Sequence, residues 1–113
     1  MVAQHKLQVM TLLTELQDEL QQLGWWQQHA PSEQALQSQQ PFCVDTLEFA
    51  QWLQWIFIAR MQTMVMTDQA LPRQCAIYEM AEVVYRDQLA LTTSLLSCLK
   101  RIDTAVMASA VLH

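Results

Sequence analysis

The chain of 113 residues is 52% hydrophobic and has a formal net charge of −5, with six lysines and arginines in total. A chain of this length can bury roughly two thirds of its unfolded surface, so a core that needs no disulfide or metal support is expected. Because phosphate contacts supply most of the affinity for nucleic acid, the acidic charge argues against direct RNA or DNA binding and against binding to an anionic membrane surface.

Residues that favour helices dominate the chain, and residues that interrupt helices are scarce. Leu, Gln, Ala, Met and Glu are abundant, whereas there are one glycine and three prolines. No segment alternates apolar and polar residues over the length that a strand requires. The sequence therefore predicts an all-α fold and one domain over residues 1–113. We expect a compact bundle of four main helices, with a short extra helical turn in the first connection.

The first predicted helix covers residues 2–23 and carries a regular apolar seam. Its members recur at steps of three and four: Val9, Leu13, Leu16, Leu20 and Leu23. A sustained coiled coil needs more heptads than this seam provides, so we expect the helix to pack on the central helix of the same chain. Gly24 follows as a helix-ending residue.

Two adjacent tryptophans, Trp25 and Trp26, come next and lie outside any periodic pattern. Such a pair either anchors the connection to the core or forms a ligand surface. The large area that aromatic side chains bury favours the anchor. The rest of the connection, residues 27–40, is rich in glutamine, and Pro31-Ser32-Glu33 predicts the start of one short helical turn.

The stretch from Pro41 to Met61 predicts the central helix. Asp45 is a favourable N-cap, and Glu48, three residues later, completes a capping box. Val44 and Phe49 have the spacing of a hydrophobic staple, in which one side chain before the helix packs on one inside it. We therefore expect the helix to begin directly after Asp45.

Apolar residues surround most of the predicted central helix, so neighbouring helices should enclose it. One row consists of Phe49, Trp52, Ile56, Ala59 and Thr63. Four polar residues interrupt the apolar run: Glu48, Gln51, Gln54 and Arg60. With these interruptions the run is too short to span a membrane. Two roles stay open for Arg60, which either extends to water or pairs with Asp45, Glu48 or a neighbouring carbonyl.

Two more helices are predicted after a break at residues 67–72. The third covers residues 77–86, and its inward side chains are expected to be Met80, Val83 and Val84. The fourth covers residues 88–106 and has Asp87 as its cap. Its inward row is Leu91, Leu95, Cys98, Ile102 and Ala105.

The residue types that carry chemistry do not form a recognisable site. Cys43, Cys75 and Cys98 lack the spacing of a zinc site or a disulfide framework, and buried cytosolic thiols are expected. The three histidines share no helical face with another ligand, and Glu79 and Glu82 are expected on a solvated face. We therefore predict no metal, no cofactor and no catalytic residues. The N-terminus lacks the apolar region of a signal peptide, which favours a cytoplasmic location.

Two stretches resemble the YqcC-like family of small bacterial proteins. The first is the pattern PF–DT–F–WLQWIFI–RM within residues 41–61, and the second contains Leu71-Pro72, Cys75-Ala76-Ile77 and Met80-Ala81-Glu82. The resemblance covers nearly the full chain and implies an all-helical bundle of uncharacterised function. It also implies an association with a tRNA pseudouridine synthase, because such genes commonly neighbour those of the family. Ala59 stands where the family usually has a proline, so we expect a more regular helix here.

Two functions are compatible with these observations. The first is a non-enzymatic accessory protein that binds a protein partner, such as an RNA-modifying enzyme of the pseudouridine synthase type. The alternative is a small-molecule binding module with a pocket between the central helix and the Trp25-Trp26 loop. The residues expected to bind a partner are Trp25, Trp26, Gln51, Gln54, Trp55 and Arg60. Those expected to hold the structure are Asp45, Glu48, Phe49, Trp52 and Ile56.

The expected binding surface is an edge of the central helix. Gln51 and Trp55 are four residues apart and Gln54 is adjacent, so the three should lie on one side of the helix. With Trp25 or Trp26 nearby they would form a half-exposed patch of aromatic rings and amides. The other possibility is that Trp55 belongs to the core and the glutamines face water.

Overall fold

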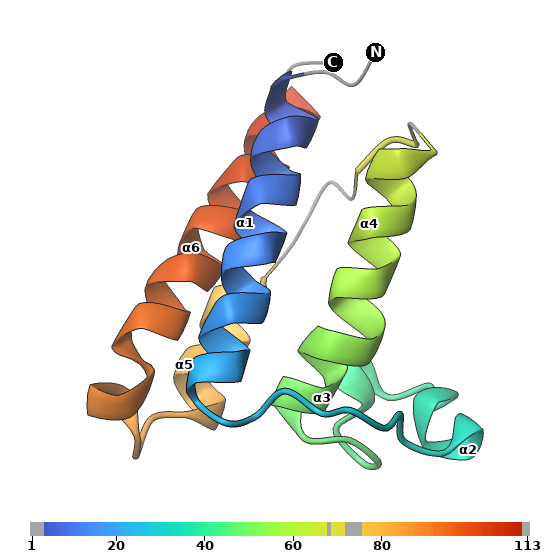
Figure 1. Ribbon diagram of the computed structural model, residues 1–113, viewed down its shortest axis with the longest axis vertical. Coiled ribbons are helices and arrows are strands. Elements are labelled where there is room, and N and C mark those ends of the chain that lie inside the picture. Colours follow the sequence, from blue (N-terminus) through green and yellow to red (C-terminus); the bar gives the residue numbers. More distant parts are fainter. Residues whose placement is uncertain (1–3, 68, 72–75, 112–113) are drawn as a thin grey trace.

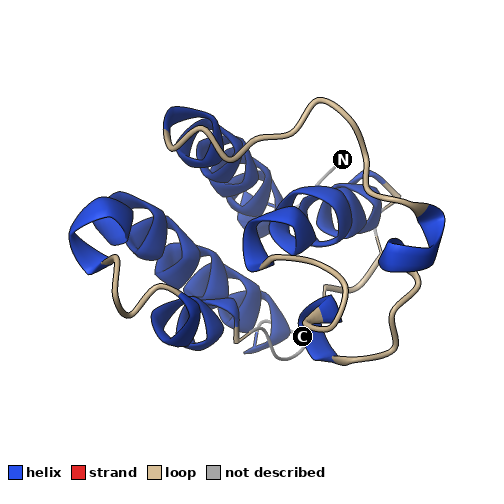
Figure 2. Ribbon diagram, turned by 90° about the horizontal axis from the view of Figure 1, so that it is seen from below, coloured by secondary structure: helices blue, strands red, loops and turns tan. Residues whose placement is uncertain are grey.

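The computed structural model describes residues 4–67, 69–71 and 76–111 and shows an arrangement of helices around one hydrophobic core (Figure 1). No strand occurs in the described ranges (Figure 2). The elements are α1 (Gln4–Gln22), α2 (Glu33–Leu36), a 3-10 turn (Pro41–Cys43), α3 (Phe49–Trp52), a π-helical segment (Leu53–Ile58), α4 (Ala59–Met66), α5 (Ile77–Val84) and α6 (Leu89–Val111). Since α3, the π segment and α4 follow without a break, they form one central helix. The predicted all-α bundle is confirmed.

The predicted short turn in the first connection is α2. Ser32 is its N-cap, and the Ser32 hydroxyl accepts a hydrogen bond from the Ala35 N–H at 3.1 Å. This bond satisfies one of the backbone donors that the first turn of any helix leaves free.

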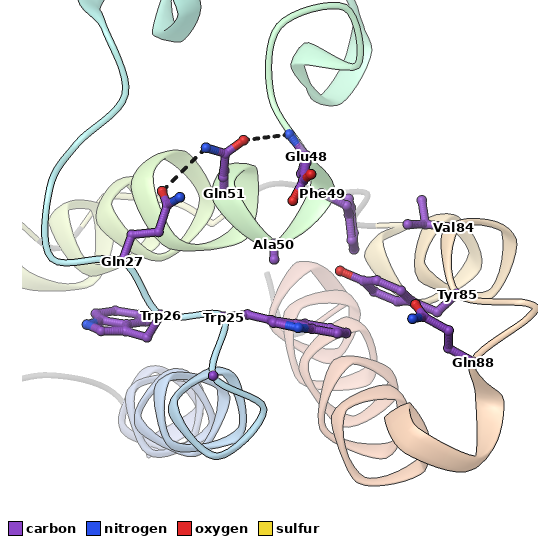
Figure 3. Close-up of a pocket in the computed structure, with 11 residues that line it drawn as sticks. Trp25, Trp26, Gln27, Glu48, Phe49, Ala50, Gln51, Val84, Tyr85 and Gln88 are labelled. Atoms are coloured by element: carbon purple, nitrogen blue, oxygen red, sulfur yellow. Dashed lines mark hydrogen bonds between the residues drawn. The ribbon is translucent and has the colours of Figure 1, made fainter.

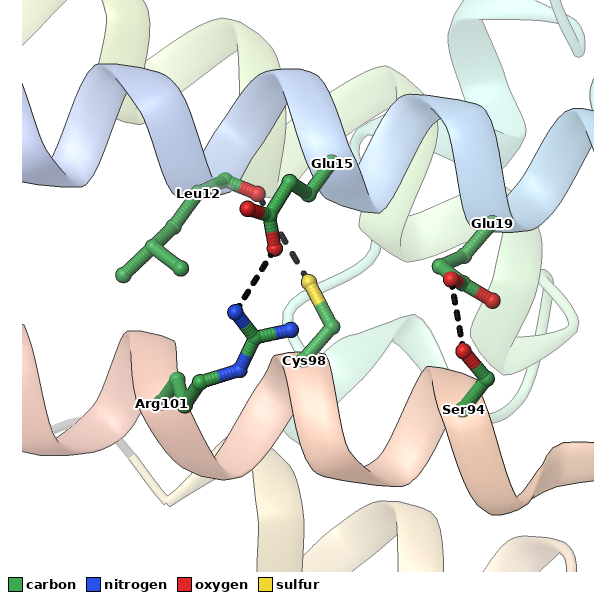
Figure 4. Close-up of polar contacts among 6 residues, drawn as sticks. All are labelled: Leu12, Glu15, Glu19, Ser94, Cys98 and Arg101. Carbon is green, nitrogen blue, oxygen red and sulfur yellow. Dashed lines mark hydrogen bonds and ion pairs between the residues drawn. The ribbon is translucent and has the colours of Figure 1, made fainter.

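Helices α1 and α6 lie side by side and run in opposite directions (Figure 1). The predicted seam of α1 is buried from Val9 to Leu20. It contacts α4 of the central helix, as expected, but its chief partner is α6, which was not predicted. Two exposed polar pairs flank the contact, an ion pair between Glu15 and Arg101 at 2.8 Å and a hydrogen bond from Ser94 to Glu19 at 2.7 Å (Figure 4). Such exposed pairs contribute little, so apolar burial holds the two helices together.

The end of α1 confirms the role predicted for Gly24. This glycine has a φ of 77°, a left-handed conformation that costs a residue with a side chain more than it costs glycine. The Trp25 N–H donates to the Leu20 carbonyl at 2.9 Å, and the Gly24 N–H donates to the Gln21 carbonyl at 3.0 Å. This pair of bonds is a Schellman motif, and it turns the chain toward the central helix.

The central helix begins at Phe49, three residues later than predicted. Asp45 lies in the preceding turn, where its carboxylate accepts a hydrogen bond from the Ser38 hydroxyl, so it is not the N-cap. Val44 is 54% exposed, which excludes the predicted staple with Phe49. The reason is local. Phe42 and Cys43 have φ values of 56° and 52°, and the Cys43 carbonyl accepts hydrogen bonds from the Thr46 and Leu47 N–H groups, so residues 42–47 form a separate turn before the helix.

Glu48 is the N-cap of the central helix, and its capping-box partner is Gln51. The Gln51 Oε1 accepts a hydrogen bond from the Glu48 N–H at 2.8 Å. The sequence signal for a capping box was therefore present, but it belonged to a pair three residues further along the chain.

A change of helical period decides which side of the central helix is buried. The buried positions recur every four residues: Phe49, Leu53, Phe57, Met61 and Val65. In an α-helix each step of four advances about 40° beyond a full turn, so such a row would drift off the core. The wider π turn at Leu53–Ile58 compensates for this drift. The predicted row is accordingly wrong at Ala59 and Thr63, which are exposed.

Helix α5 buries Ile77 and Ala81, with Tyr85 just beyond its end. The inward placement of Val83 and Val84 is wrong, because they are 65% and 40% exposed. Asp103 of α6 fixes the rotation of α5: its carboxylate accepts from the Ile77 N–H at 3.3 Å and from the Tyr78 N–H at 2.9 Å. Because Asp103 lies 26 and 25 residues after the two donors, this cap could not be recognised from local spacing.

Helix α6 confirms most of its predicted row. Leu95, Cys98, Ile102 and Ala105 are buried, whereas Leu91, in the first turn, is 57% exposed. Gln88 directly precedes the helix, so Asp87 is not its cap. None of the described helices combines the length and hydropathy required to cross a membrane.

Candidate functional site

A network of amides joins the first connection to the central helix. Gln54 is 6% exposed and bonds to the backbone of Gln27 in both directions. The Gln27 N–H donates to Gln54 Oε1 at 2.8 Å, and Gln54 Nε2 donates to the Gln27 carbonyl at 2.7 Å. A buried carboxamide with unmade hydrogen bonds would be costly, and these two bonds satisfy it. The loop that carries both tryptophans is thereby fixed on the π segment.

The side chain of Gln27 extends the network on the surface. Its Oε1 accepts from the Trp55 indole Nε1 at 3.0 Å and from Gln51 Nε2 at 3.4 Å. Trp55 and Gln51 are half-buried, and both come from one edge of the central helix. The structure therefore brings together Gln51, Gln54 and Trp55, as the sequence predicted, and the residue that joins them is Gln27.

Two cavities lie on either side of this network. The first has a volume of about 560 Å³ and lies between the Trp25-Trp26 loop, the start of the central helix and the loop from α5 to α6 (Figure 3). The second is an open groove of about 490 Å³. Residues of the groove include Trp26, Trp55, Ala59 and several glutamines: Gln17, Gln27, Gln28, Gln54 and Gln62.

Aromatic rings form much of the first pocket. Trp25 stacks on Tyr85 with 5.1 Å between ring centroids, and Tyr85 meets Phe49 edge-on at 6.1 Å. Burial, and to a smaller extent the nearby Glu48 carboxylate, raise the pKa of Tyr85 to about 12. The phenol is therefore neutral at physiological pH. Among the described residues that line this pocket, Glu48 is the charged one.

The tryptophans combine the two predicted roles. Trp25 and Trp26 are half-buried and pack against the core, as anchors do, and both also line a cavity. Trp55 is half-buried with its indole N–H bonded, so it belongs neither wholly to the core nor wholly to the surface. Whether any of the three binds a partner stays a prediction.

The remaining predicted residues fall into two groups. Arg60 is exposed, lies outside the linings of both cavities, and forms no ion pair with Asp45 or Glu48 in the described part of the chain. Of the structural set, Phe49 is buried and Trp52 and Ile56 are half-buried, whereas Asp45 and Glu48 are exposed.

No group of three or more potential metal ligands occurs within the described ranges. Cys43 and Cys98 are buried free thiols, as predicted, and Cys75 lies outside the described residues. Burial raises the pKa of the Cys98 thiol to about 12; Arg101 lowers it by a smaller amount, and Glu15 and Glu19 raise it further. A thiol with such a pKa is a poor nucleophile.

The sequence did not reveal the parts that Gln27 and Tyr85 play. Gln27 sits in a glutamine-rich connection and nothing distinguishes it from its neighbours. The available signal was Gln54, an amide inside a mostly apolar helix, which had to find hydrogen-bond partners elsewhere in the chain.

Comparison with known proteins gives matches over most of the chain. The profile of a family described as "DUF446: tRNA pseudouridine synthase C" matches residues 8–105. An uncharacterized protein of Haemophilus influenzae is 45% identical over 65 residues, which cover 58% of this chain and 61% of that protein. The uncharacterized protein YqcC of Escherichia coli is 37% identical over 81 residues, which cover 69% of this chain and 72% of YqcC.

A third relative is a longer protein. A Pectobacterium carotovorum protein named tRNA pseudouridine synthase C is 38% identical over 66 residues, which cover 58% of this chain and 18% of that protein. The chain thus matches less than two thirds of the Haemophilus and Pectobacterium relatives. The solution NMR structure of E. coli YqcC has a TM-score of 0.85 to this fold at 27% identity, and the match covers 96% of this chain and 92% of that one. The chain belongs to the DUF446 family and is a relative of E. coli YqcC, which confirms the resemblance predicted from its sequence.

Proposed function

We propose that this protein is a non-enzymatic cytoplasmic protein that binds a protein partner through the groove between Trp26 and Trp55. The observation that carries the proposal is that the half-buried Trp26 and Trp55 line one groove. The two hydrogen bonds between Gln54 and the Gln27 backbone hold the Trp26 loop in this position. Tryptophan is enriched among the residues that contribute most to protein interfaces. Because the Gln27–Gln54 bonds already order the loop, little conformational entropy remains to be lost on binding.

The partner we propose is an RNA-modifying enzyme of the tRNA pseudouridine synthase type. A segment similar to this chain makes up 18% of a relative with that name, so in that relative it shares a polypeptide with a much longer sequence. A separate chain would achieve the same proximity by binding non-covalently. The net charge of −5 suits a partner with a basic RNA-binding surface and disfavours competition for the RNA itself.

Two measurements test this proposal. The first is co-purification of the tagged protein from its own host, in which we expect a stoichiometric pseudouridine synthase. The second is titration of the purified synthase with two matched variants. Ala59→Arg places a long cationic side chain at the groove, whereas Thr63→Arg adds the same charge one turn away, outside the groove lining.

Both positions are exposed, so both variants should melt like the wild type. We expect Ala59→Arg to weaken binding at least about tenfold and Thr63→Arg to leave it unchanged, as expected when one interface centre is blocked. Recovery of no stoichiometric protein would overturn the proposed function. Equal binding by the two variants would show that the partner uses another surface.

The 560 Å³ pocket favours a second candidate function, a small-molecule binding module. Its volume lies in the range of about 300–1,000 Å³ that ligand sites occupy, and its lining combines aromatic rings with a few polar groups. Tryptophan fluorescence against a panel of metabolites tests it, because Trp25 and Trp26 line the pocket. A flat response without thermal stabilisation would contradict this function.

A further inference from the structure

The first pocket has the chemical character of a cation site. Of the described residues in its lining, one carries a formal charge, the acidic Glu48, and none is a lysine or arginine. Four aromatic side chains accompany it: Trp25, Trp26, Phe49 and Tyr85. The faces of aromatic rings carry negative electrostatic potential and attract ammonium and guanidinium groups, most strongly in tryptophan and tyrosine.

An anionic ligand is disfavoured by the same arrangement. The start of the central helix faces this pocket, and the free N–H groups of a helix start commonly bind anions. Here the capping box already occupies the N–H groups of Glu48 and Gln51, and the Glu48 carboxylate adds a negative charge. An anion would therefore meet a carboxylate where it needs hydrogen-bond donors.

The acidic group is held in place at the rim. The capping box restrains Glu48 through the Gln51 side chain, which Gln27 in turn holds from the loop. Figure 3 shows the Glu48 carboxylate and the Tyr85 ring bordering the same space, with Trp25 on its other side. The raised pKa of Tyr85, to which Glu48 contributes, is consistent with this proximity. The Glu48 carboxylate and the aromatic side chains thus border one ligand position.

We infer that this pocket binds an organic cation, an alkylammonium or guanidinium group on a short apolar stem. The charged head lies at Glu48 and the stem contacts Trp25 and Tyr85. The inference rests on the second candidate function and names its ligand class. The same chemistry has two sources, a free small molecule or a lysine or arginine side chain that a partner inserts.

The test uses pairs of probes that differ in charge but hardly in shape. Choline is compared with 3,3-dimethylbutan-1-ol, and Nα-acetylarginine amide with Nα-acetylcitrulline amide. Binding is followed by NMR through the indole N–H signals of Trp25 and Trp26, with Trp55 as the reference across the amide network. We expect each cation to bind about five- to thirtyfold more tightly than its neutral partner, as cation–aromatic contacts at partly exposed sites allow. A preference for choline indicates a free ligand, and a preference for the arginine amide indicates a side chain.

Three variants locate the charge that matters. Glu48→Gln should weaken cation binding about threefold to fivefold, as loss of one exposed ion pair predicts, while Glu79→Gln on the exposed side of α5 should not change it. Because Glu48 also caps a helix, Glu48→Gln could change binding through the fold as well as through the charge. Gln88→Glu is therefore a second test that adds charge and leaves the cap intact. Gln88 lines the pocket and precedes α6, so a second carboxylate there should tighten binding without harm to the fold.

Each outcome decides the inference. Tight binding of the neutral probes would overturn the cation assignment and leave the pocket as a ligand site. Equal effects of Glu48→Gln and Glu79→Gln, with no gain from Gln88→Glu, would show that the cation binds elsewhere. No shift with any probe would overturn the inference, while the metabolite panel would still decide whether the pocket binds small molecules.

Discussion

The carboxamide of Gln54 and the backbone of Gln27 form a reciprocal pair of hydrogen bonds between the central helix and the first connection, at 2.8 and 2.7 Å. The pairing resembles one rung of a β-sheet, with a side-chain amide in place of a second strand. Gln54 belongs to the π-helical segment, and Gln27 lines both cavities. Since π segments are frequent at functional sites, this rung is the structural centre of the candidate site.

Replacement of the buried Gln54 by leucine should destabilise the protein, even though an apolar side chain is usually favourable at a buried position. The Gln27 N–H and carbonyl would lose their partners, and each unsatisfied buried group costs on the order of 1–3 kcal/mol. We expect a loss of about 2–4 kcal/mol in the free energy of unfolding, measured by urea melts. Gln62→Leu is the control, because Gln62 lines the same groove but is not part of the network described above. It should stay within about 0.5 kcal/mol of the wild type. Equal losses would show that the rung contributes nothing specific.

The sequence predicted the features that depend on local signals. Gly24 ends α1 because few other residues adopt its left-handed conformation readily, and the α6 row from Leu95 to Ala105 follows α-helical periodicity. One predicted row of the central helix is wrong at Ala59 and Thr63, because α-helical spacing does not hold through the π segment. The strict steps of four from Phe49 to Val65 carried that information, since an α-helix would rotate such a row off the core.

Features that depend on contacts between distant residues escaped prediction. Asp103 caps α5 from α6, and Gln27 reaches the central helix from a loop that precedes it by 24 residues or more in sequence. The candidate site was therefore half predicted: the edge from Gln51 to Trp55 follows from helical spacing, and the Trp25-Trp26 loop was expected near it, but the part that Gln27 plays follows from tertiary structure alone. The place of Tyr85 in the pocket was missed as well, because it depends on contacts with Trp25 and Phe49, which are distant in sequence.

Trp52→Ala should cost much more stability than Asp45→Ala. Trp52 stacks on Phe49 and Phe57 and meets Phe42 edge-on, with centroids 4.8 to 5.9 Å apart. Since it is half-buried, we expect a loss of about 3 kcal/mol, at the lower end for large aromatic truncations. Asp45 is exposed and caps no helix, so its replacement should cost at most about 0.5 kcal/mol. A larger effect at Asp45 in urea melts would contradict the helix start at Phe49.

Substitution of Gly24 should measure the free-energy cost of a positive φ separately from any steric clash. A Cβ built on this residue meets no atom within 4 Å, so steric crowding does not contribute. The positive φ alone should make Gly24→Ala lose about 1–2 kcal/mol, and Gly24→Asn should lose less because asparagine tolerates this conformation. Thermal melts of the two variants provide the comparison. An alanine variant as stable as the wild type would show that the Schellman turn adopts another conformation.

The buried thiol of Cys98 should make the protein less stable in alkali. It donates to the Leu12 carbonyl at 3.6 Å between α1 and α6, and burial raises its pKa from 9.0 to about 12 (Figure 4). Between these values the folded chain keeps a proton that the unfolded chain releases. Its contribution to stability is therefore complete below pH 9 and is lost as the pH rises toward 12.

Cys98→Ala removes this titration, so the variant should lose less free energy of unfolding than the wild type between pH 8 and pH 10.5, whatever its stability at pH 8. Urea melts at the two pH values give the difference directly. Tyr85→Phe is the companion variant, because the pKa of Tyr85 is raised from 10.0 to about 12. Above pH 10 this variant should lose less free energy of unfolding than the wild type. Parallel losses in the wild type and Cys98→Ala would mean that the thiol ionises as freely in the folded chain as in the unfolded one. That result would contradict the tight packing of α1 on α6 at this position.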